Sequence, residues 1–581
     1  MSYDPAHLPA LRARLRDKGL DGYVVWRGDM YSGEEVRPCN ERLAAISGFT
    51  GSAGYALIMT DTAICFSDGR YHLQMQTQLD DVTWQWRDSG PSALHDALSS
   101  EGGTLTIGVD AATTTKARFD ALPSQAGDTN LHWQLLDENL IDDVWHKRPA
   151  ISRHAAYDLS DDITGQSAAE KYAKLQAYLR DNKQDGILIS APDCVNWLCN
   201  IRGYDLANTP FHLCFAYVPA TGLPCLIDAE TKREDVTTTT LTAFLEEAGQ
   251  LTGQHISYDA ATLPMALYQT LVANEVMVTA EACPITAWKA SKNTTELSGF
   301  RQAHLQDAIA FCEFWYECET DATLTERHET ALVSRLQQCR QRQPDYLCDS
   351  FETIMGAGPN GAIIHYRAIE GADSLIQDNS LLLIDSGGHY RIGTTDITRT
   401  LAIGTPSAEM RHAYSAVLAA HIALAKAAFP AGTDGAALDA ICRAPLWAEG
   451  LDFAHGTGHG VGHILSVHEG PAHISKRGRV PLETAMILSN EPGYYKEGAF
   501  GIRLENLVAV TPPEMGFHRF ETITIVPFER DLIDTGLLGP EAVAWLDEYH
   551  ARVADRLSPH MATPEMAAWL QAKCAPLADN G

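Results

Sequence analysis

Residues 381–400, LLLIDSGGHYRIGTTDITRT, decide the fold of the last third of this chain. An apolar run ends in Asp385, and a second stretch, residues 393–400, is rich in β-branched residues and contains Asp396. Both runs predict strands, with a turn at residues 386–388 between them. If these strands pair antiparallel, both carboxylates point to one side of the sheet, where they suit a hard cation. A single Asp at a strand end is more often a turn cap, so the pair must be judged with the segments that follow.

A glycine-rich segment with three histidines comes next, residues 455–463, HGTGHGVGH. Its histidines are four residues apart, as in a helical zinc pair, but the glycines between them argue against a helix. We expect an extended or looping backbone that can approach a ligand closely, with separate roles for His455 and His459. A flexible surface loop is the alternative for this segment alone.

Two further acids follow. Glu491 ends an apolar run and precedes a proline that fixes a turn. In residues 501–510, GIRLENLVAV, a strand-like alternation places Arg503 and Glu505 on one face. Four carboxylates and one imidazole at one point repel each other unless cations are present, and two divalent ions supply the four positive charges needed. The candidate ligands of such a two-metal site are Asp385, Asp396, His459, Glu491 and Glu505.

The first half of the chain contains an internal repeat. Residues 11–25 resemble residues 175–189, and each copy predicts an amphipathic helix, a turn and a buried strand. Residues 43–49 also resemble residues 198–204, with a longer spacing in the first copy that indicates an insertion near residues 34–42. We therefore expect a duplicated α/β domain.

The length of 581 residues is enough for two to four domains. A polar stretch at residues 291–296 is followed by a long helical pattern, so a third domain should begin there. The predicted domains are residues 1–155, 156–290 and 291–581, and the third holds every chemical motif described above.

The amino-acid composition limits the kinds of partner that we expect the protein to bind and the cellular compartment in which we expect it. The formal net charge is −31 and no Lys/Arg cluster is present, so nucleic acid and anionic membranes are excluded as partners. The 13 cysteines are scattered without a Cys-x-x-Cys pair, which fits a reduced compartment. Neither a signal peptide nor an apolar run of the ~18 residues of a membrane span is present. We expect a soluble, cytoplasmic protein.

Several motifs together resemble one family. They are GPNGAIIHYR (358–367), LLLIDSGG (381–388), GTTDITRT (393–400), HGTGHGVGH (455–463), VHEGP (467–471), NEPGYY (490–495) and GIRLEN (501–506). Together with SGFTGSAG and SDGRY near the start, they resemble aminopeptidase P, the Xaa-Pro aminopeptidases of metallopeptidase family M24, in the three-domain cytosolic form. The resemblance implies an α/β (α+β) fold, with two creatinase-like N-terminal domains before a pita-bread catalytic domain. It also implies a homodimer that removes the N-terminal residue from peptides with proline in second position.

The resemblance also assigns roles to the metal ligands. It makes Asp385 and Asp396 ligands of one ion and His459 and Glu491 ligands of the other, with Asp396 and Glu505 bridging both. All five positions match the family pattern. Carboxylate-rich coordination favours Mn²⁺, with Zn²⁺, Co²⁺ or iron as alternatives.

The remaining site residues follow from the same resemblance. Glu491 resembles the general base, with a role as a ligand alone as the alternative. His365 and His468 are expected to act in catalysis and to contact substrate, because an imidazole can donate to an oxyanion or a peptide carbonyl. The other expected substrate contacts are His455, Tyr495 and Arg503. Arg503 could instead orient Glu505 or His459. Glu34 and Arg70 are candidate contributors from the first domain.

Two other functions stay open. A prolidase shares the catalytic fold and most ligands, but it cleaves only dipeptides and usually has one preceding domain. A pita-bread domain that has lost its metal can serve as a peptide-binding module, and such a module should show broken ligands. This sequence retains all five.

Overall fold

The two copies of the sequence repeat form the same local structure in the computed structural model, which describes residues 3–99, 101–231 and 233–577. Helix α1 (His7–Lys18) leads into strand β1 (Gly22–Trp26), and α8 (Ala168–Asp181) leads into β9 (Gly186–Ile189). Gly19, with φ of 67°, ends α1 in the left-handed conformation that glycine adopts without steric cost. A capping box between Ser167 and Glu170 begins α8. The predicted helix, turn and buried strand are confirmed in both copies.

Two sheets with the same neighbour relations are built on these strands. Strand β1 pairs antiparallel with β2 (Tyr55–Met59) and parallel with β5 (Gly103–Asp110). In the second sheet β9 pairs antiparallel with β11 (Phe215–Pro219) and parallel with β14 (His255–Tyr258). The strand orders are β4-β3-β2-β1-β5-β7-β6 and β13-β12-β11-β9-β14-β15. The shared topology supports a duplicated α/β domain. The other strands are β3 (Ala63–Ser67), β4 (Gln85–Asp88), β6 (Gln125–Ala126), β7 (Thr129–Leu136), β12 (Cys225–Ile227), β13 (Thr237–Thr239) and β15 (Met277–Ala280).

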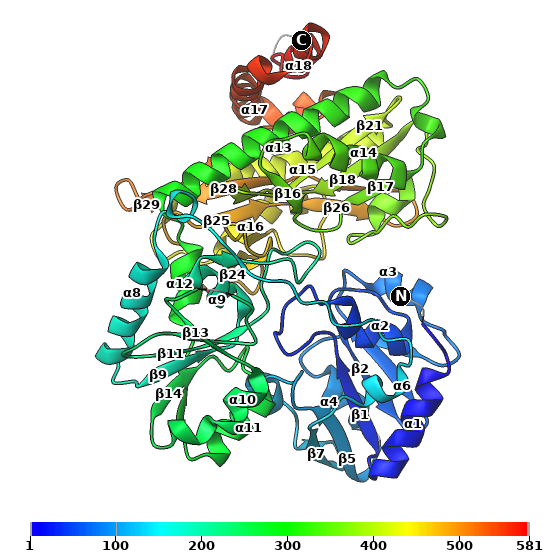
Figure 1. Cartoon of the computed structure of the whole chain (residues 1–581). Coiled ribbons are helices and arrows are strands. Elements are labelled where there is room, and N and C mark those ends of the chain that lie inside the picture. Colours follow the sequence, from blue (N-terminus) through cyan, green and yellow to red (C-terminus); the bar gives the residue numbers. More distant parts are fainter. Residues whose placement is uncertain (1–2, 100, 232, 578–581) are drawn as a thin grey trace. The chain divides into compact units, whose positions relative to one another are not determined.

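Contacts divide the chain into two compact units, both drawn in Figure 1. Unit 1 comprises residues 1–160 and 166–285 and contains the two repeated sheets. Unit 2 comprises residues 161–165 and 286–581. The more detailed boundaries predicted from the sequence, with three domains, stay a prediction.

A long helix opens the main part of unit 2, as the sequence predicts. Helix α13 (Thr294–Thr320) begins with a capping box between Asn293 and Glu296. Its apolar face is buried at the predicted positions Phe300, His304, Ala308, Phe311 and Trp315. Figure 1 shows this helix lying across the strands of unit 2, where it contributes to the main hydrophobic core.

Several sheets and the longer helices that follow α13 make up most of the described part of unit 2. The sheets have the orders β16-β19-β20, β17-β18-β21, β24-β23-β25-β28-β30 and β26-β27, and the short strands β22 (Phe429–Pro430) and β29 (Phe517–His518) form a further pair. The strands that carry the site are β17 (Ile354–Ala357), β18 (Ser380–Ser386), β19 (Gly388–Tyr390), β20 (Gly393–Thr394), β21 (Ile397–Ile403), β23 (Gly458–Gly460), β24 (Glu469–Ile474), β25 (Ile487–Asn490), β26 (Gly493–Lys496), β27 (Phe500–Arg503) and β28 (Asn506–Val510). Strands β16 (Tyr346–Asp349) and β30 (Phe520–Thr522) lie at sheet edges. The helices are α14 (Glu329–Gln341), α15 (Ala408–Ala425), α16 (Gly435–Ala448), α17 (Thr535–Leu557) and α18 (Pro564–Lys573).

The strands around the two aspartates pair antiparallel, as predicted, but the chain reverses at a different place. Strand β18 pairs with β21, with Asp385 opposite Thr398. The tight turn lies at residues 391–392, between β19 and β20, and residues 386–388 carry the chain from one sheet to the next. The reason is steric, because a Cβ atom on Gly387 would lie 2.0 Å from the Thr395 carbonyl oxygen. Glycine here permits close approach of two strands rather than a turn.

Residues 501–510 form two strands instead of the continuous strand predicted. Strand β27 pairs with β26, whereas β28 belongs to the five-stranded sheet. At the break, the Leu504 amide donates to the Pro492 carbonyl oxygen at 3.2 Å, and the Glu505 amide donates to the Thr398 carbonyl oxygen at 3.0 Å. These bonds to other segments satisfy the backbone where the strand changes sheets. Alternation alone does not reveal such a change.

None of the helices within the described residues combines the length and the apolar character needed to cross a bilayer.

Candidate metal centre

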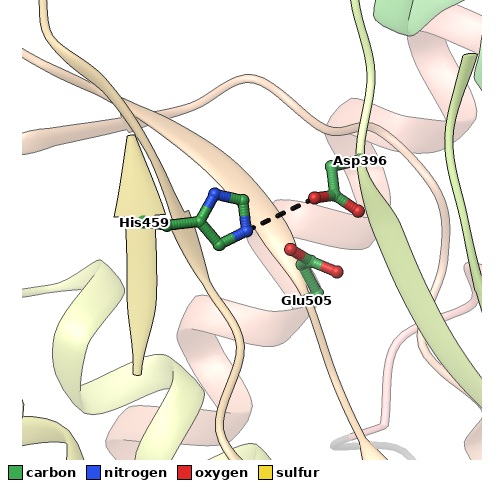
Figure 2. A group of neighbouring side chains, drawn as sticks. All are labelled: Asp396, His459 and Glu505. Atoms are coloured by element: carbon green, nitrogen blue, oxygen red, sulfur yellow. Dashed lines mark ion pairs between the residues drawn. The ribbon is translucent and has the colours of Figure 1, made fainter. Parts of the chain in front are cut away.

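Three predicted ligands lie together in the core of unit 2. Ligand atoms of Asp396, His459 and Glu505 are all within 4.8 Å of one another (Figure 2). The His459 Nε2 atom is 3.5 Å from Asp396 Oδ2 and 3.5 Å from Glu491 Oε1. Asp385 joins them electrostatically, because its charge and those of Asp396 and Glu491 all raise the pKa of Glu505. The structure thus brings all five predicted ligand positions into one neighbourhood.

Strand ends position these side chains. Asp385 is on β18, and Asp396 lies between β20 and β21. His459 is on the short strand β23, so the extended backbone predicted for the glycine-rich segment is confirmed. Glu491 follows β25, and Glu505 lies at the break between β27 and β28. Ligands held on the ends of neighbouring strands have little freedom, which suits a preorganised site.

Hydrogen bonds orient the imidazole of His459. Its Nδ1 atom donates to the Gly460 carbonyl oxygen at 3.0 Å, because a carbonyl can only accept. The other nitrogen, Nε2, then offers its lone pair toward the carboxylates, as a metal-binding histidine requires. The Ser489 hydroxyl accepts from the His459 amide at 2.9 Å and donates to Glu491 Oε1 at 3.2 Å. Ser489 therefore holds two of the predicted ligands in register.

The acids of the site are destabilised by burial and by one another. Burial is the main cause that raises the pKa of Glu505 well above its ordinary value. Burial also raises the pKa of Asp385, opposed by the Arg503 guanidinium. The pKa of Glu491 is raised for the same reason, opposed by His459. These shifts show that the carboxylates need positive charge to stay ionised together.

Two oxygen atoms test whether cations fit this site. Among the described residues, no group donates a hydrogen bond to the buried atoms Asp385 Oδ1 and Asp396 Oδ1. The Thr398 hydroxyl has a single proton and donates it to Glu505 Oε2 at 2.8 Å. A buried carboxylate oxygen without a partner is costly, and a cation is the partner that suits several such oxygens at once. The donor set therefore fits divalent metal ions.

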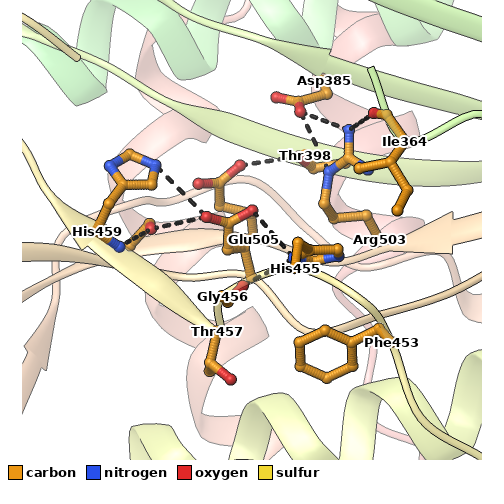
Figure 3. A network of polar contacts seen from close by, with 12 residues as sticks. Ile364, Asp385, Thr398, Phe453, His455, Gly456, Thr457, His459, Arg503 and Glu505 are labelled. Carbon is orange, nitrogen blue, oxygen red and sulfur yellow. Dashed lines mark hydrogen bonds and ion pairs between the residues drawn. The ribbon is translucent and has the colours of Figure 1, made fainter. Parts of the chain in front are cut away.

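A chain of hydrogen bonds borders the acids, and Figure 3 shows its two ends, Arg503 with Asp385 and His455 with Gly456. Arg503 donates to Asp385 Oδ2 at 2.6 and 3.1 Å and to the Tyr495 hydroxyl at 2.7 Å. The Tyr495 hydroxyl bonds His455 Nε2 at 2.8 Å, and His455 Nδ1 donates to the Gly456 carbonyl oxygen at 2.7 Å. Burial lowers the pKa of His455 well below its ordinary value, so this imidazole is neutral. Both of its nitrogens are engaged within the protein.

These hydrogen bonds involve three residues that the sequence predicts as substrate contacts. Arg503 is 2% exposed, and it also donates to the Ile364 carbonyl oxygen at 3.4 Å. Among the predicted ligands, the residue that Arg503 bonds is Asp385, rather than Glu505 or His459. Burial raises the pKa of Tyr495 to about 12, so its hydroxyl stays protonated. Substrate contact by His455, Tyr495 and Arg503 stays a prediction, and their observed bonds are those of groups that hold the site in place.

The two expected catalytic histidines lie at the edge of the site. The His468 ring stands perpendicular to the His459 ring, with centroids 4.3 Å apart, and its side chain is exposed. His365 is half-buried and close enough to His455 for its charge to lower the pKa of that group. Both imidazoles are at least partly open to solvent, His468 beside His459 and His365 near His455.

Residues that sequence reasoning missed are the small hydroxyl groups behind the ligands. Thr398 and Ser489 each bond a predicted ligand directly. Thr398 lies two residues after Asp396 in the same motif and Ser489 two residues before Glu491, so proximity to an acid was the available signal.

The candidates Glu34 and Arg70 belong to unit 1, where Glu34 accepts from Ser52 Oγ at 3.1 Å and Arg70 is bonded to Asp68 at 2.7 and 2.8 Å. Their contribution to the site stays a prediction.

Family comparisons agree with this geometry. Residues 298–512 match metallopeptidase family M24, and residues 516–577 match the C-terminal region of peptidase M24. Residues 7–134 and 147–296 each match a Creatinase/Prolidase N-terminal domain. The predicted fold class is confirmed.

Full-length relatives carry the same resemblance. A probable Xaa-Pro aminopeptidase P of Laccaria bicolor is 37% identical and covers 98% of this chain and 93% of its own length. Another, from Chaetomium globosum, is 34% identical over 98% of this chain and 99% of its own length. These relatives confirm the resemblance to aminopeptidase P found in the sequence.

Solved structures extend the comparison. An X-prolyl aminopeptidase from Caenorhabditis elegans, described as a cytosolic enzyme with a di-nuclear active site, superposes with a TM-score of 0.91 at 30% identity, over 98% of this chain and 99% of that chain. A Xaa-Pro dipeptidase from Bacillus anthracis shares the fold alone. It superposes with a TM-score of 0.53 at 23% identity, over 62% of this chain and 99% of that chain. With relatives above 30% identity along nearly its whole length and an M24 match over the site, this chain belongs to metallopeptidase family M24.

Proposed function

We propose that this protein is a Xaa-Pro aminopeptidase that removes the first residue from peptides with proline in second position. The observation that carries the proposal is the buried cluster of Asp396, His459 and Glu505, with Asp385 and Glu491 beside it. Relatives named Xaa-Pro aminopeptidase P over the full length of the chain give the reaction and the substrate class.

Two divalent metal ions are the proposed cofactors. Asp385 and Asp396 would hold one ion, His459 and Glu491 the other, and Asp396 with Glu505 would be shared between them. Mn²⁺ is the proposed metal, because four carboxylates and one imidazole form a hard ligand set. When bound, such ions supply Lewis acidity and lower the pKa of water, which is the chemistry that peptide hydrolysis needs.

The side chains then divide the remaining work. Glu491 is the proposed general base, because a positioned carboxylate can accept a proton from the attacking water in the transition state. His365 and His468 would donate hydrogen bonds to the peptide carbonyl and to the oxyanion that develops on it. Their partly open positions, His468 beside His459 and His365 near His455, support these roles. Arg503 and Tyr495 would hold Asp385 and His455 in position through the bonds already described.

Proline in second position sets the recognition problem. The nitrogen of an X-Pro bond carries no hydrogen, so an enzyme cannot use an amide donor at that position. Recognition must therefore come from the ring shape, the fixed φ angle and the free amino terminus of the peptide. The net charge of −31 also favours the approach of a positively charged amino terminus.

The proposal extends to the domains, the oligomeric state and the cellular location of the protein. We propose domains at residues 1–155, 156–290 and 291–581, a homodimer and a cytoplasmic location. The two sheets of unit 1 support the division, and the description of the nematode enzyme as cytosolic supports the location.

One experiment tests the proposal. The purified protein is treated with chelator, reloaded with Mn²⁺, or in parallel with Zn²⁺ or Co²⁺, and incubated with the tripeptides Ala-Pro-Ala and Ala-Ala-Ala, with N-acetylated Ala-Pro-Ala and with the dipeptide Ala-Pro. Mass spectrometry should detect release of free Ala from the first peptide, far slower cleavage of the second and none of the third. Cleavage confined to X-Pro dipeptides would instead indicate a prolidase. An absence of hydrolysis with Mn²⁺, Zn²⁺ and Co²⁺ would indicate a binding module.

A further inference from the structure

A buried glutamate outside the metal cluster organises the loop that carries His365. Glu329 is the first residue of α14 and is 0% exposed. Its carboxylate accepts from the Ala357 amide at 2.7 Å, from the Ser374 amide at 2.9 Å and from the Tyr366 hydroxyl at 2.7 Å. The Asn360 side-chain amide lies 3.0 and 3.1 Å from its two oxygens. Both carboxylate oxygens are thus saturated by neutral donors.

These donors span one loop from end to end. Ala357 ends β17, Asn360 lies in the 3₁₀ turn Gly358–Ala362, and Ser374 is near the far end of the loop. His365 lies between Asn360 and Tyr366, so the carboxylate fixes the chain on both sides of that histidine. The Glu329 amide adds a bond to the Ser374 carbonyl oxygen at 3.1 Å, which closes the loop onto the helix. Hydrogen bonds to an ionised carboxylate are shorter and stronger than neutral ones.

The loop also contacts the site directly. The Ile364 carbonyl oxygen accepts from Arg503, which in turn bonds Asp385. Close packing reinforces this contact, because a Cβ atom on Gly501 would lie 1.7 Å from the Gly361 carbonyl oxygen. The loop is therefore held against β27 on one side and by Glu329 on the other.

We infer that Glu329 is a positioning residue that acts on catalysis through His365. It fixes the loop from residue 357 to residue 374, so that the His365 imidazole is presented to the substrate carbonyl. The inference rests on the proposed function, since it uses the substrate contact assigned to His365. Glu329 itself touches neither the acids of the metal cluster nor the substrate.

A double-mutant cycle tests the inference on the metal-loaded enzyme with Ala-Pro-Ala as substrate. Glu329→Gln replaces one acceptor oxygen with an NH₂ group that opposes the donors, so the loop should loosen. Because a misplacement of about 1 Å can cost on the order of 100-fold in rate, we expect kcat to fall by roughly 10- to 100-fold, with metal content unchanged and KM changed less. In a His365→Ala background, the same substitution should cause no further loss, because residues that act as a unit are not additive.

A structural readout and a matched control accompany the kinetics. Hydrogen–deuterium exchange of Glu329→Gln should be faster in peptides covering residues 358–374 and unchanged in residues 381–400. Ser334→Ala is the control, since Ser334 is an exposed residue of α14 whose hydroxyl donates to the Thr330 carbonyl oxygen of the same helix at 2.9 Å. This variant should retain the activity and exchange of the unchanged protein. Glu329→Asp, which keeps the charge, should recover part of the lost rate.

Several results would overturn the inference. They are an unchanged kcat in Glu329→Gln, equal losses with and without His365, or loss of metal. If Glu329→Gln does not fold, Tyr366→Phe decides, because it removes a single donor; we expect a loss of roughly 3- to 10-fold that disappears in the His365→Ala background. Equal losses in both backgrounds would overturn the inference here too. Failure of the unchanged enzyme to release Ala from Ala-Pro-Ala would overturn the proposed function, whereas an active enzyme indifferent to Glu329 would overturn this inference alone.

Discussion

Replacing Glu505 with Gln should stabilise the metal-free protein while weakening its binding of metal. Glu505 is 2% exposed, and burial together with the charges of Asp396, Glu491 and Asp385 raises its pKa well above the ordinary value of 4.5. An uncompensated buried charge costs on the order of 3 kcal/mol. Glutamine removes that charge but weakens the bond from Thr398, at a cost of about 1 kcal/mol. The net gain of about 2 kcal/mol corresponds to a rise in Tm of roughly 4 to 8 °C.

The effect of Glu505→Gln on the stability of the metal-free protein depends on pH. A carboxyl whose folded-state pKa is raised contributes stability that is complete below the unfolded pKa and is lost as pH rises through the folded pKa. In chelator, the Tm of the unchanged protein should therefore fall as pH rises above about 4.5, and the advantage of Glu505→Gln should be largest near pH 8. Glu514→Gln, at an exposed glutamate of the same unit, should show no such advantage.

Bound metal should make the unchanged protein more stable than Glu505→Gln, the reverse of the order expected in chelator. At a free Mn²⁺ concentration of 100 times its Kd, the unchanged protein should gain about 2.7 kcal/mol, or roughly 5 to 10 °C in Tm, and Glu505→Gln should gain far less. Differential scanning fluorimetry in chelator and in Mn²⁺, with metal content measured by mass spectrometry, gives both quantities. The reasoning is refuted if metal-free Glu505→Gln is less stable than the unchanged protein at pH 8, or if the variant binds two ions with full activity.

Other substitutions separate the ligands from the residues around them. Asp385→Asn should lower metal content and abolish release of Ala from Ala-Pro-Ala, because neighbouring carboxylates cannot replace a charged ligand, and two bound ions with retained activity would contradict the assignment. His365→Ala and His468→Ala should keep both metal and fold while losing at least about 100-fold in turnover, and metal loss in either variant would make that histidine a ligand. Tyr495→Phe breaks the chain from Arg503 to His455 without removing charge, so it should lower kcat by about 10-fold at constant metal content.

The sequence was most informative where chemistry and local pattern coincide. Asp385 ends an apolar run and Asp396 lies within a β-branched run, both runs predict strands, and the antiparallel pairing of those strands follows from their short separation. The helix of residues 294–320 was visible from its periodic apolar face and from the polar residues that cap it. The repeat was visible because both copies conserve the same helix, turn and strand in the same order.

The sequence was least informative where a bond joins distant segments. Arg503 and Asp385 are 118 residues apart, and no local pattern indicates that they pair. The same limit explains why the turn predicted at residues 386–388 is not found there, since the close approach of Thr395 to Gly387 is a tertiary contact. It also explains the missed break at Glu505, whose amide bonds Thr398 in another strand.

The arrangement of charge around Asp385 argues that this site evolved around cations. Arg503 donates twice to Asp385 Oδ2, whereas no described residue donates to Oδ1. A protein that needed only a stable core could neutralise or replace these acids, because buried ion pairs are often no better than apolar packing. This chain instead holds Asp385, Glu491 and Glu505 in place with neighbouring guanidinium and hydroxyl groups and leaves selected oxygens unsatisfied. Such a core costs stability without metal and is favourable only when divalent ions complete it.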